Sequence, residues 1–111
     1  KFELTLTNLS NSEYSINYYV NKNIKSNTIR NKSNNYIINE DFFQEPFEIV
    51  FRSLSVILRQ VSNSYYPPRG KNLQNLINLL NSKKFKKATL SGCIIEKINN
   101  SLKIYKEKRK I

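Results

Sequence analysis

The stretch that decides the fold runs from residue 45 to residue 80 and reads EPFEIVFRSLSVILRQVSNSYYPPRGKNLQNLINLL. In its first part, apolar residues recur at spacings of three and four, which places them on one face of a helix at about 100° per residue. This spacing predicts an amphipathic helix. Its apolar face consists of Phe47, Val50, Phe51, Leu54, Ile57, Leu58 and Val61.

Prolines mark both limits of this helix. Pro46 suits the first turn, because its fixed φ fits a helix and its missing N–H would have no partner there. A proline disfavours helical backbone in the residue before it, so the helix must end ahead of Pro67-Pro68. We expect the last helical residue near Asn63 or Ser64.

A second, shorter helix is predicted after the prolines. Leu73, Leu76, Ile77 and Leu80 again recur at helical spacing. Residues 44–82 are therefore expected to form a helical hairpin around a Tyr-Tyr-Pro-Pro-Arg-Gly turn.

The overall charge indicates the kind of partner that the chain binds. Nineteen Lys and Arg against eight Asp and Glu give a formal net charge of +11 over 111 residues. This imbalance attracts polyanions, either nucleic acid or an anionic membrane surface. No apolar run approaches the roughly 20 residues of a spanning helix and no signal-peptide pattern is present, so we expect a cytoplasmic protein without a membrane partner.

Catalytic chemistry is hard to place in this sequence. It has no histidine, one cysteine and scattered acidic residues, so neither a transition-metal site nor a His-dependent triad is predicted. We expect Cys93 to be a small buried hydrophobe. The chain contains no Met and begins with Lys1 inside a strand-like pattern, so we expect it to be a piece of a longer protein.

Residues 1–43 are predicted to supply strands and a mobile basic loop. Apolar and polar residues alternate over residues 1–7 and again over 14–20, the period of half-buried strands that pair as a hairpin. Residues 21–35 hold too little apolar surface to offset their ordering entropy, so we expect a mobile loop or a weak strand. Residues 36–38 are expected to form a short strand.

Residues 88–107 are predicted to form a β-hairpin. Its first strand covers residues 88–98, in which Gly92 marks a bulge or a close approach of another backbone. Asn99-Asn100 suits a tight turn because Asn tolerates positive φ, and residues 102–105 form the return strand. The predicted fold class is α+β, a helical hairpin packed with small antiparallel β-hairpins.

Two arginines and two aliphatic residues share the far side of the central helix. Arg52 and Arg59 lie roughly opposite the apolar face, with Ile49 and Val56 beside them. The aliphatic pair predicts that a further element, such as the sheet, covers this side. The arginines are either solvated or paired with Glu45 or Glu48, or they contact phosphate.

A cluster of four lysines around one aromatic residue follows the second helix. Two interpretations fit the segment Lys83-Lys84-Phe85-Lys86-Lys87. In the first, the lysines bind phosphates while Phe85 stacks on a base; in the second, the segment is an exposed loop that Phe85 anchors. Both alternatives stay open. The candidate RNA-binding residues of the chain are Arg52, Arg59, Arg69, Lys71, Lys83, Lys84, Lys86 and Lys87.

Short motifs in residues 44–109 follow one another in a distinctive order. They are Phe51-Arg52-Ser53-Leu54 opening a helix, Tyr66-Pro67-Pro68-Arg69, a Leu-rich helix, Ala88-Thr89-Leu90-Ser91-Gly92-Cys93, and a hairpin ending in Lys106-Glu107-Lys108-Arg109. In order and spacing this segment resembles the accessory region of bacterial tRNA(Ile)-lysidine synthetases. Ser91 stands where a second glycine is usual in that family, and Lys106 where an arginine is usual.

In that family, an N-terminal domain of the ATP-pyrophosphatase type adenylates the wobble cytidine of the anticodon and joins lysine to it. The Ser-Gly-Gly-x-Asp-Ser phosphate loop of that domain is absent from this sequence. The resemblance therefore implies that ATP, Mg and lysine are bound by a separate catalytic domain. It implies that residues 1–111 are an accessory region with no cofactor or catalytic residue, which recognises tRNA(Ile).

A different class of function stays open, namely a structural or protein-interaction domain whose positive charge is generic. Fourteen of the nineteen basic residues are Lys, and Asn and Ile are abundant, which is typical of an AT-rich coding bias. Clustering of the charge on one folded face would favour nucleic-acid binding instead. The oligomeric state, a homodimer included, stays open as well.

Overall fold

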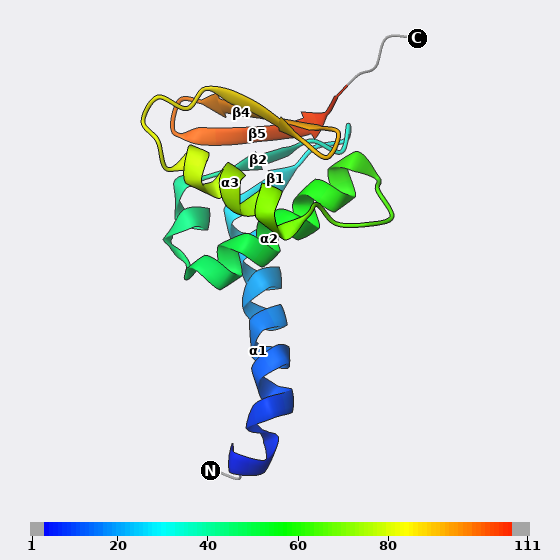
Figure 1. Cartoon of the computed structure of the whole chain (residues 1–111), viewed down its shortest axis with the longest axis vertical. Coiled ribbons are helices and arrows are strands. Elements are labelled where there is room, and N and C mark those ends of the chain that lie inside the picture. Colours follow the sequence, from blue (N-terminus) through cyan, green and yellow to red (C-terminus); the bar gives the residue numbers. More distant parts are fainter. Residues whose placement is uncertain (1–3, 108–111) are drawn as a thin grey trace.

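The protein has two layers, an antiparallel sheet and a set of helices on one of its faces (Figure 1). The computed structural model describes the backbone of residues 4–107 and the side chains of residues 15–107. The predicted α+β class is confirmed. In chain order the elements are α1 (Leu4–Asn27), β1 (Thr28–Arg30), β2 (Tyr36–Ile38), the short 3₁₀ helix η1 (Glu40–Gln44), α2 (Phe47–Ser62), α3 (Gly70–Leu80), β3 (Lys87–Leu90), β4 (Cys93–Ile98) and β5 (Ser101–Lys106).

Strands from both halves of the chain build one five-stranded sheet with the order β1-β2-β5-β4-β3. Neighbouring strands are antiparallel throughout. The halves meet where β2 pairs with β5, with Tyr36 opposite Ile104 and Ile38 opposite Leu102. All four side chains are buried, so this register turns the apolar faces of both strands toward the helices.

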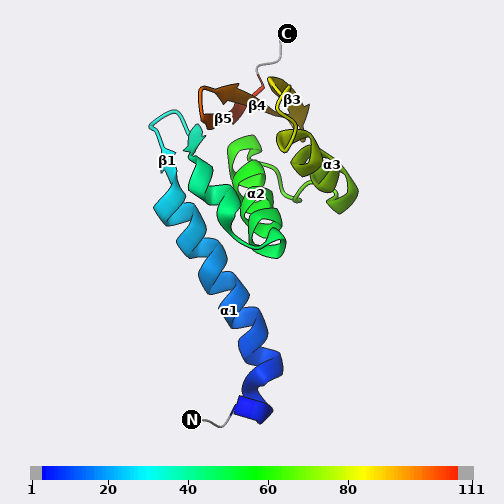
Figure 2. The same cartoon turned by 90° about the vertical axis from the view of Figure 1, so that its left-hand side faces the viewer.

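The core lies between the sheet and α2. Leu54 and Leu58 of α2 are fully buried and share one apolar cluster with Ile95 and Ile104 of the sheet. Figure 2 shows α2 between α1 on one side and α3 on the other, below the sheet. The predicted apolar face of the central helix is therefore the centre of the fold, although Phe47 in its first turn is exposed.

The limits predicted for the helical hairpin agree closely with the structure. α2 begins directly after Pro46, whose carbonyl accepts the amide hydrogen of Ile49 at 2.9 Å. Its last residue is Ser62, and the C-cap Asn63 adopts a left-handed conformation with φ of 57° and donates its amide hydrogen to the carbonyl of Arg59. α3 begins at Gly70, beyond the proline pair.

The prediction for the N-terminal segment is wrong. The strands expected at residues 1–7 and 14–20, and their hairpin, are replaced by α1 from Leu4 onward, and residues 1–3 lie outside the described part. The side of α1 that faces the body carries the apolar Val20 and Ile24 and, between and after them, Asn23 and Asn27. Because Asn occupies positions that are usually apolar in an amphipathic helix, the helical period is hidden in the sequence.

Residues 21–35, expected as a mobile loop or a weak strand, divide into three pieces. They form the end of α1, the edge strand β1 and the turn that leads into β2, so the weak-strand alternative is right for β1 alone. The side-chain oxygen of Asn31 closes the turn by accepting the amide hydrogens of Ser33 and Asn35. The strand predicted at residues 36–38 is confirmed as β2.

Residues 88–98 form two strands instead of one. β3 and β4 are joined by a tight turn in which Ser91 and Gly92 have φ of 53° and 79°. The bulge or close backbone approach predicted at Gly92 is wrong, because a Cβ there would meet open space, and the glycine serves the positive φ of the turn. The turn predicted at Asn99-Asn100 is confirmed between β4 and β5.

The element that covers the far side of α2 is α1 rather than the sheet. Ile49 is buried on this side, and Val56 is half-buried in a groove that Val20 of α1 also lines. The side-chain amide of the buried Asn23 donates to Ser53 Oγ of α2 at 3.3 Å. The expectation that α2 is covered on two sides is therefore right, and the covering element is different.

Cys93 is fully buried, as expected from the sequence. Its thiol donates to the carbonyl of Leu58 in α2 at 3.3 Å. Burial raises the pKa of the Cys93 thiol to about 11, although hydrogen bonds with Ser62 and the charge of Lys106 act in the lowering direction. The nucleophilic thiolate is therefore scarce at neutral pH, and Cys93 is a packing residue.

Candidate nucleic-acid interface

The eight candidate cations all lie in a stretch of the chain without acidic residues. From Ile49 to Ile95 the sequence contains eight Lys and Arg residues and no Asp or Glu. Seven of these side chains are exposed, and Arg52 is half-buried. A positive potential therefore extends over the helical hairpin and the loop that follows it.

Arg52 is the candidate whose charge is compensated by the fold. Its Nε donates to Oε2 of Glu48, one helical turn earlier, at 2.6 Å. The ion pair that the sequence offered as an alternative to phosphate contact is therefore confirmed for Arg52. Because a carboxylate already faces this guanidinium, Arg52 is a weaker phosphate ligand than cations without an acidic neighbour.

Arg59 lies further along the same helix and is exposed. A groove beside it is lined by Val56, Asn63 and Pro67, so it runs between α2 and the loop to α3. Within the described part of the chain, no acidic side chain forms an ion pair with Arg59. Its guanidinium can therefore offer a bidentate fork to a phosphate.

Arg69 and Lys71 flank the first residue of α3 and are exposed. The carbonyl of Arg69 accepts the amide hydrogen of Leu73 at 2.9 Å, which ties this residue to the helix. The first turn of α3 carries no acidic residue. The partial positive charge at the beginning of the helix therefore adds to the charges of the two side chains.

The four loop lysines surround a residue of the core. Phe85 is buried in the apolar cluster, so the stacking role considered for it is wrong, and Phe85 anchors the loop instead. The amide of Phe85 donates to the carbonyl of Ser82 at 3.2 Å, and the amide of Lys97 donates to the carbonyl of Lys86 at 2.8 Å. Lys83, Lys84 and Lys86 thus project from a loop that is held at both ends, and the exposed Lys87 begins β3.

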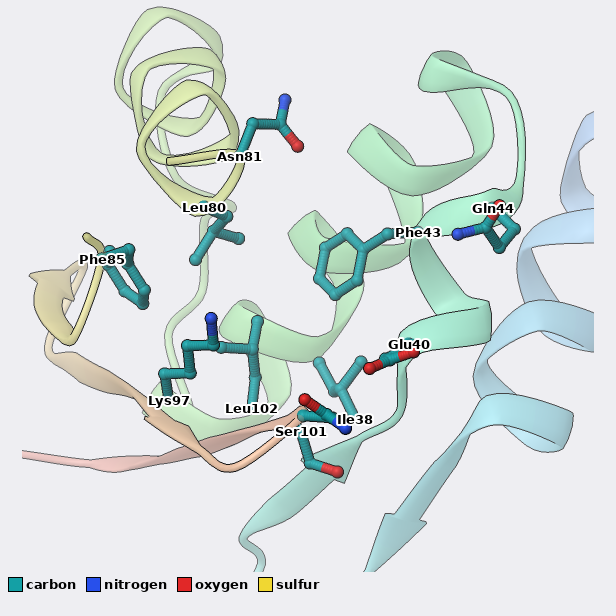
Figure 3. A pocket seen from close by; sticks show the side chains of 11 residues that line it. Ile38, Glu40, Phe43, Gln44, Leu80, Asn81, Phe85, Lys97, Ser101 and Leu102 are labelled. Carbon is teal, nitrogen blue, oxygen red and sulfur yellow. The ribbon is translucent and has the colours of Figure 1, made fainter. Parts of the chain in front are cut away.

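A pocket of about 260 Å³ opens beside this loop, where the end of α3 meets the sheet (Figure 3). Phe43 and Phe85 lie on opposite sides of it, and Leu80 adds a further apolar wall. Glu40 and Lys97 contribute opposite charges to its lining. The pocket is smaller than the roughly 300 Å³ at which ordinary small-molecule sites begin, so we assign no cofactor to it.

The candidates form two groups rather than one patch. We define the hairpin group as Arg52, Arg59, Arg69 and Lys71, and the loop group as Lys83, Lys84, Lys86 and Lys87. The loop group follows the end of α3, whereas Arg69 and Lys71 flank its first residue and Arg52 and Arg59 lie on α2. The 11 residues of α3 span about 16 Å at the usual helical rise. A single phosphate cannot reach both groups, so an RNA that contacts both must run along α3.

Two aromatic residues at the hairpin turn escaped the sequence reasoning. Tyr65 and Tyr66 are 78% and 72% exposed, and their rings make a T-shaped contact with centroids 4.8 Å apart. The available signal was their position outside the apolar periodicity, directly before two prolines. Both tyrosines entered the sequence analysis as part of the Tyr-Tyr-Pro-Pro-Arg-Gly turn, and Tyr66 also as part of a family motif, but neither was named as a binding residue.

Within the described residues, no group of three or more His, Cys, Asp or Glu side chains could hold a metal ion. None of the helices in the same part of the chain is long and apolar enough to span a bilayer. A scan against protein-family models and searches of curated proteins and of solved structures found no match to this chain.

Proposed function

We propose that this chain is the RNA-binding part of a tRNA(Ile)-lysidine synthetase, and that it holds tRNA(Ile) while a separate domain modifies the wobble cytidine. The motif order in residues 44–109 motivates the identity of the RNA. The candidate cations form two groups rather than one patch, and the exposed lysines of the loop group support RNA binding independently of that resemblance. ATP, Mg and lysine belong to the separate domain in this proposal, and this chain performs no chemical step.

The observation that carries the proposal is the loop group on its anchored loop. All four lysines are exposed, and no acidic side chain of the described part forms an ion pair with them. Such charges release condensed counterions when they neutralise phosphates, which supplies affinity. Because Phe85 holds the loop in the core, less backbone entropy is lost when RNA binds.

Contacts of this kind position an RNA and carry little sequence information. Lysine acts as a mobile point charge, whereas arginine offers a planar fork. We therefore assign bulk attraction to the loop group and orientation of the phosphate backbone to Arg69. Discrimination among RNAs then depends on shape, that is, on whether a backbone can follow α3 from one group to the other.

The salt dependence of tRNA binding tests this proposal. If about four phosphates are neutralised, log K should fall with log salt at a slope of roughly −3. Replacing the four loop lysines by Ala should weaken binding and flatten the slope, while Tm stays nearly unchanged because the side chains are exposed. Fluorescence polarisation of labelled tRNA over a series of salt concentrations measures both quantities.

A matched control removes four cations from α1, β1 and the turn after it. In this variant Lys22, Lys25, Arg30 and Lys32 are replaced by Ala, so both variants lose the same formal charge. β1 and β3 are opposite edges of the sheet, so the control positions lie away from the loop group. The proposal fails if tRNA does not bind at low salt, or if the two variants lose affinity equally, as generic charge predicts.

The uncovered face of the sheet favours a second candidate, a protein-interaction domain. Ile29 is 70% exposed and lies in one cross-strand row with Ile37 and Lys103, and no helix of the described part covers this face (Figure 1). Exposed apolar side chains of this kind are typical of protein contacts. A homodimer in light scattering that Ile29→Lys dissociates, together with absent tRNA binding, would favour this function.

A further inference from the structure

The two tyrosines at the hairpin turn contribute little to the core. They are the most exposed large apolar side chains of the described part, at 78% and 72%. Their planes meet at 86°, so the edge of one ring contacts the other ring and open ring faces remain. The fold thus exposes two adjacent aromatic rings to water, and exposed apolar surface of this kind is typical of binding sites.

The backbone around the pair is restrained on both sides. Before it, the amide of Ser64 donates to the carbonyl of Arg59 at 3.2 Å, next to the left-handed Asn63. After it, Pro67 and Pro68 have fixed φ angles and lead directly into α3. The rings are therefore presented by a loop with restricted freedom, which lowers the entropy cost of binding.

Cations lie on both sides of the tyrosines. Arg59 and Pro67 line the same groove, so this guanidinium belongs to the surface at the beginning of the loop. Arg69 and Lys71 follow the prolines at the end of the loop. Flat apolar rings framed by positive charge are complementary to a base with its phosphates, because bases stack on aromatic rings while cations bind the backbone.

We propose that Tyr65 and Tyr66 stack on unpaired nucleotides of the bound RNA, with Arg59, Arg69 and Lys71 holding the adjoining phosphates. This inference rests on the proposed RNA-binding function and adds the class of RNA element that meets the hairpin turn. In a duplex the flat faces of the bases are already stacked on one another, whereas unpaired bases can turn outward onto a protein ring. Stacking accepts any base, so this site has little sequence preference.

The chain offers a matched control in a second tyrosine pair. Tyr18 and Tyr19 of α1 also form a T-shaped contact, with centroids 5.3 Å apart, and are 53% and 48% exposed. Cations do not lie on both sides of this pair, since Lys22 and Lys25 follow it on α1 and the nearest charged residue before it in the sequence is Glu13. Replacing either tyrosine pair by Ala therefore removes a similar area of aromatic surface, but the charged residues around the two pairs differ.

The experiment compares a ten-nucleotide oligouridine with an RNA duplex of the same length, both as ligands of the whole chain at low salt. Replacing Tyr65 and Tyr66 together by Ala should weaken oligouridine binding by about 5- to 150-fold for each stacked base, and leave duplex binding within about twofold. The conservative double change, Tyr65→Phe with Tyr66→Phe, should retain oligouridine binding because the rings remain. Tyr18→Ala with Tyr19→Ala should leave both affinities unchanged.

The outcomes separate this inference from the proposed function. If the parent binds duplex through the loop lysines and the Tyr65→Ala/Tyr66→Ala variant binds oligouridine normally, stacking is overturned and RNA binding stands. An equal loss for duplex and oligouridine also overturns stacking. If the parent binds neither ligand, both proposals fall. Thermal melts of each variant show whether the fold is kept, which the exposure of these side chains leads us to expect.

Discussion

Helices α1 and α2 are held against the rest of the protein in different ways. α2 has the sheet, α3 and α1 around it, and apolar side chains such as Leu54 and Leu58 are fully buried. α1 meets the body near its C-terminal end and extends past it, as Figure 2 shows. Its contact with α2 includes a buried hydrogen bond from Asn23 as well as the apolar Val20.

Two helices of one protein can therefore differ greatly in how well the sequence predicts them. The apolar face of α2 repeats at the helical period because it packs against a broad apolar surface. α1 needs only a few contact positions, and asparagine occupies some of them. A helix held by specific polar contacts therefore lacks the pattern by which an amphipathic helix is recognised.

Leu54→Ala should have the largest effect on stability. Leu54 is fully buried at the centre of α2, so truncation leaves a cavity and should lower the free energy of unfolding by about 2–5 kcal/mol. Val56→Ala should cost clearly less, because Val56 is half-buried in the groove beside α1. Urea denaturation of both variants measures the two losses. Equal losses would mean that α1 buries its side of α2 as completely as the sheet does.

Asn23→Leu tests the polar attachment of α1. The Asn23 amide donates to the carbonyl of Phe42 and to Ser53 Oγ, both at 3.3 Å, so the change leaves buried polar groups unpaired and should cost about 1–3 kcal/mol. Adding Ser53→Ala should recover part of this loss, since the orphaned hydroxyl is removed. The same urea measurement applies. A neutral Asn23→Leu variant would contradict the comparison and show that apolar contacts alone hold α1.

Arg52→Gln should have the smallest effect. The Arg52–Glu48 pair is partly exposed, and pairs of this kind contribute about 0–1 kcal/mol. A double-mutant cycle with Glu48→Gln, followed by thermal melting at low and high salt, isolates the coupling. A coupling energy above the loss caused by Asn23→Leu would show that the outward side of α2 is stabilised by charge rather than by its contact with α1.

Whether the sequence predicted an element depended on the kind of interaction that forms it. The helical hairpin, β2, β5 and the turn at Asn99-Asn100 could be predicted, because each depends on local periodicity or on the conformational preference of one residue. The split of residues 88–98 was missed because Leu90, Gly92 and Ile94 keep the alternation of a single strand across the turn. The sequence did not predict α1, because asparagine occupies some of its contact positions and hides the helical period.

The candidate site shows the same division. Exposure of most of the cations could be expected, since an isolated charge is rarely buried. The pairing of Arg52 with Glu48 could be named as one alternative, because residues four apart on a helix are neighbours. The burial of Phe85 could not be predicted, since an aromatic ring beside charges fits either environment, whereas the exposure of Tyr65 had a signal in its position outside the apolar periodicity.

By itself, the sequence determined the central hairpin, the α+β class, the acid-free basic stretch and the absence of histidine chemistry, because periodicity, turn preference and charge are properties of neighbouring residues. Only the tertiary structure decided that α1 is a helix, that β2 pairs with β5, and that the candidate cations form two groups rather than one patch. The physical reason is that these features depend on contacts between residues far apart in the chain. Such contacts select among local conformations that differ little in free energy.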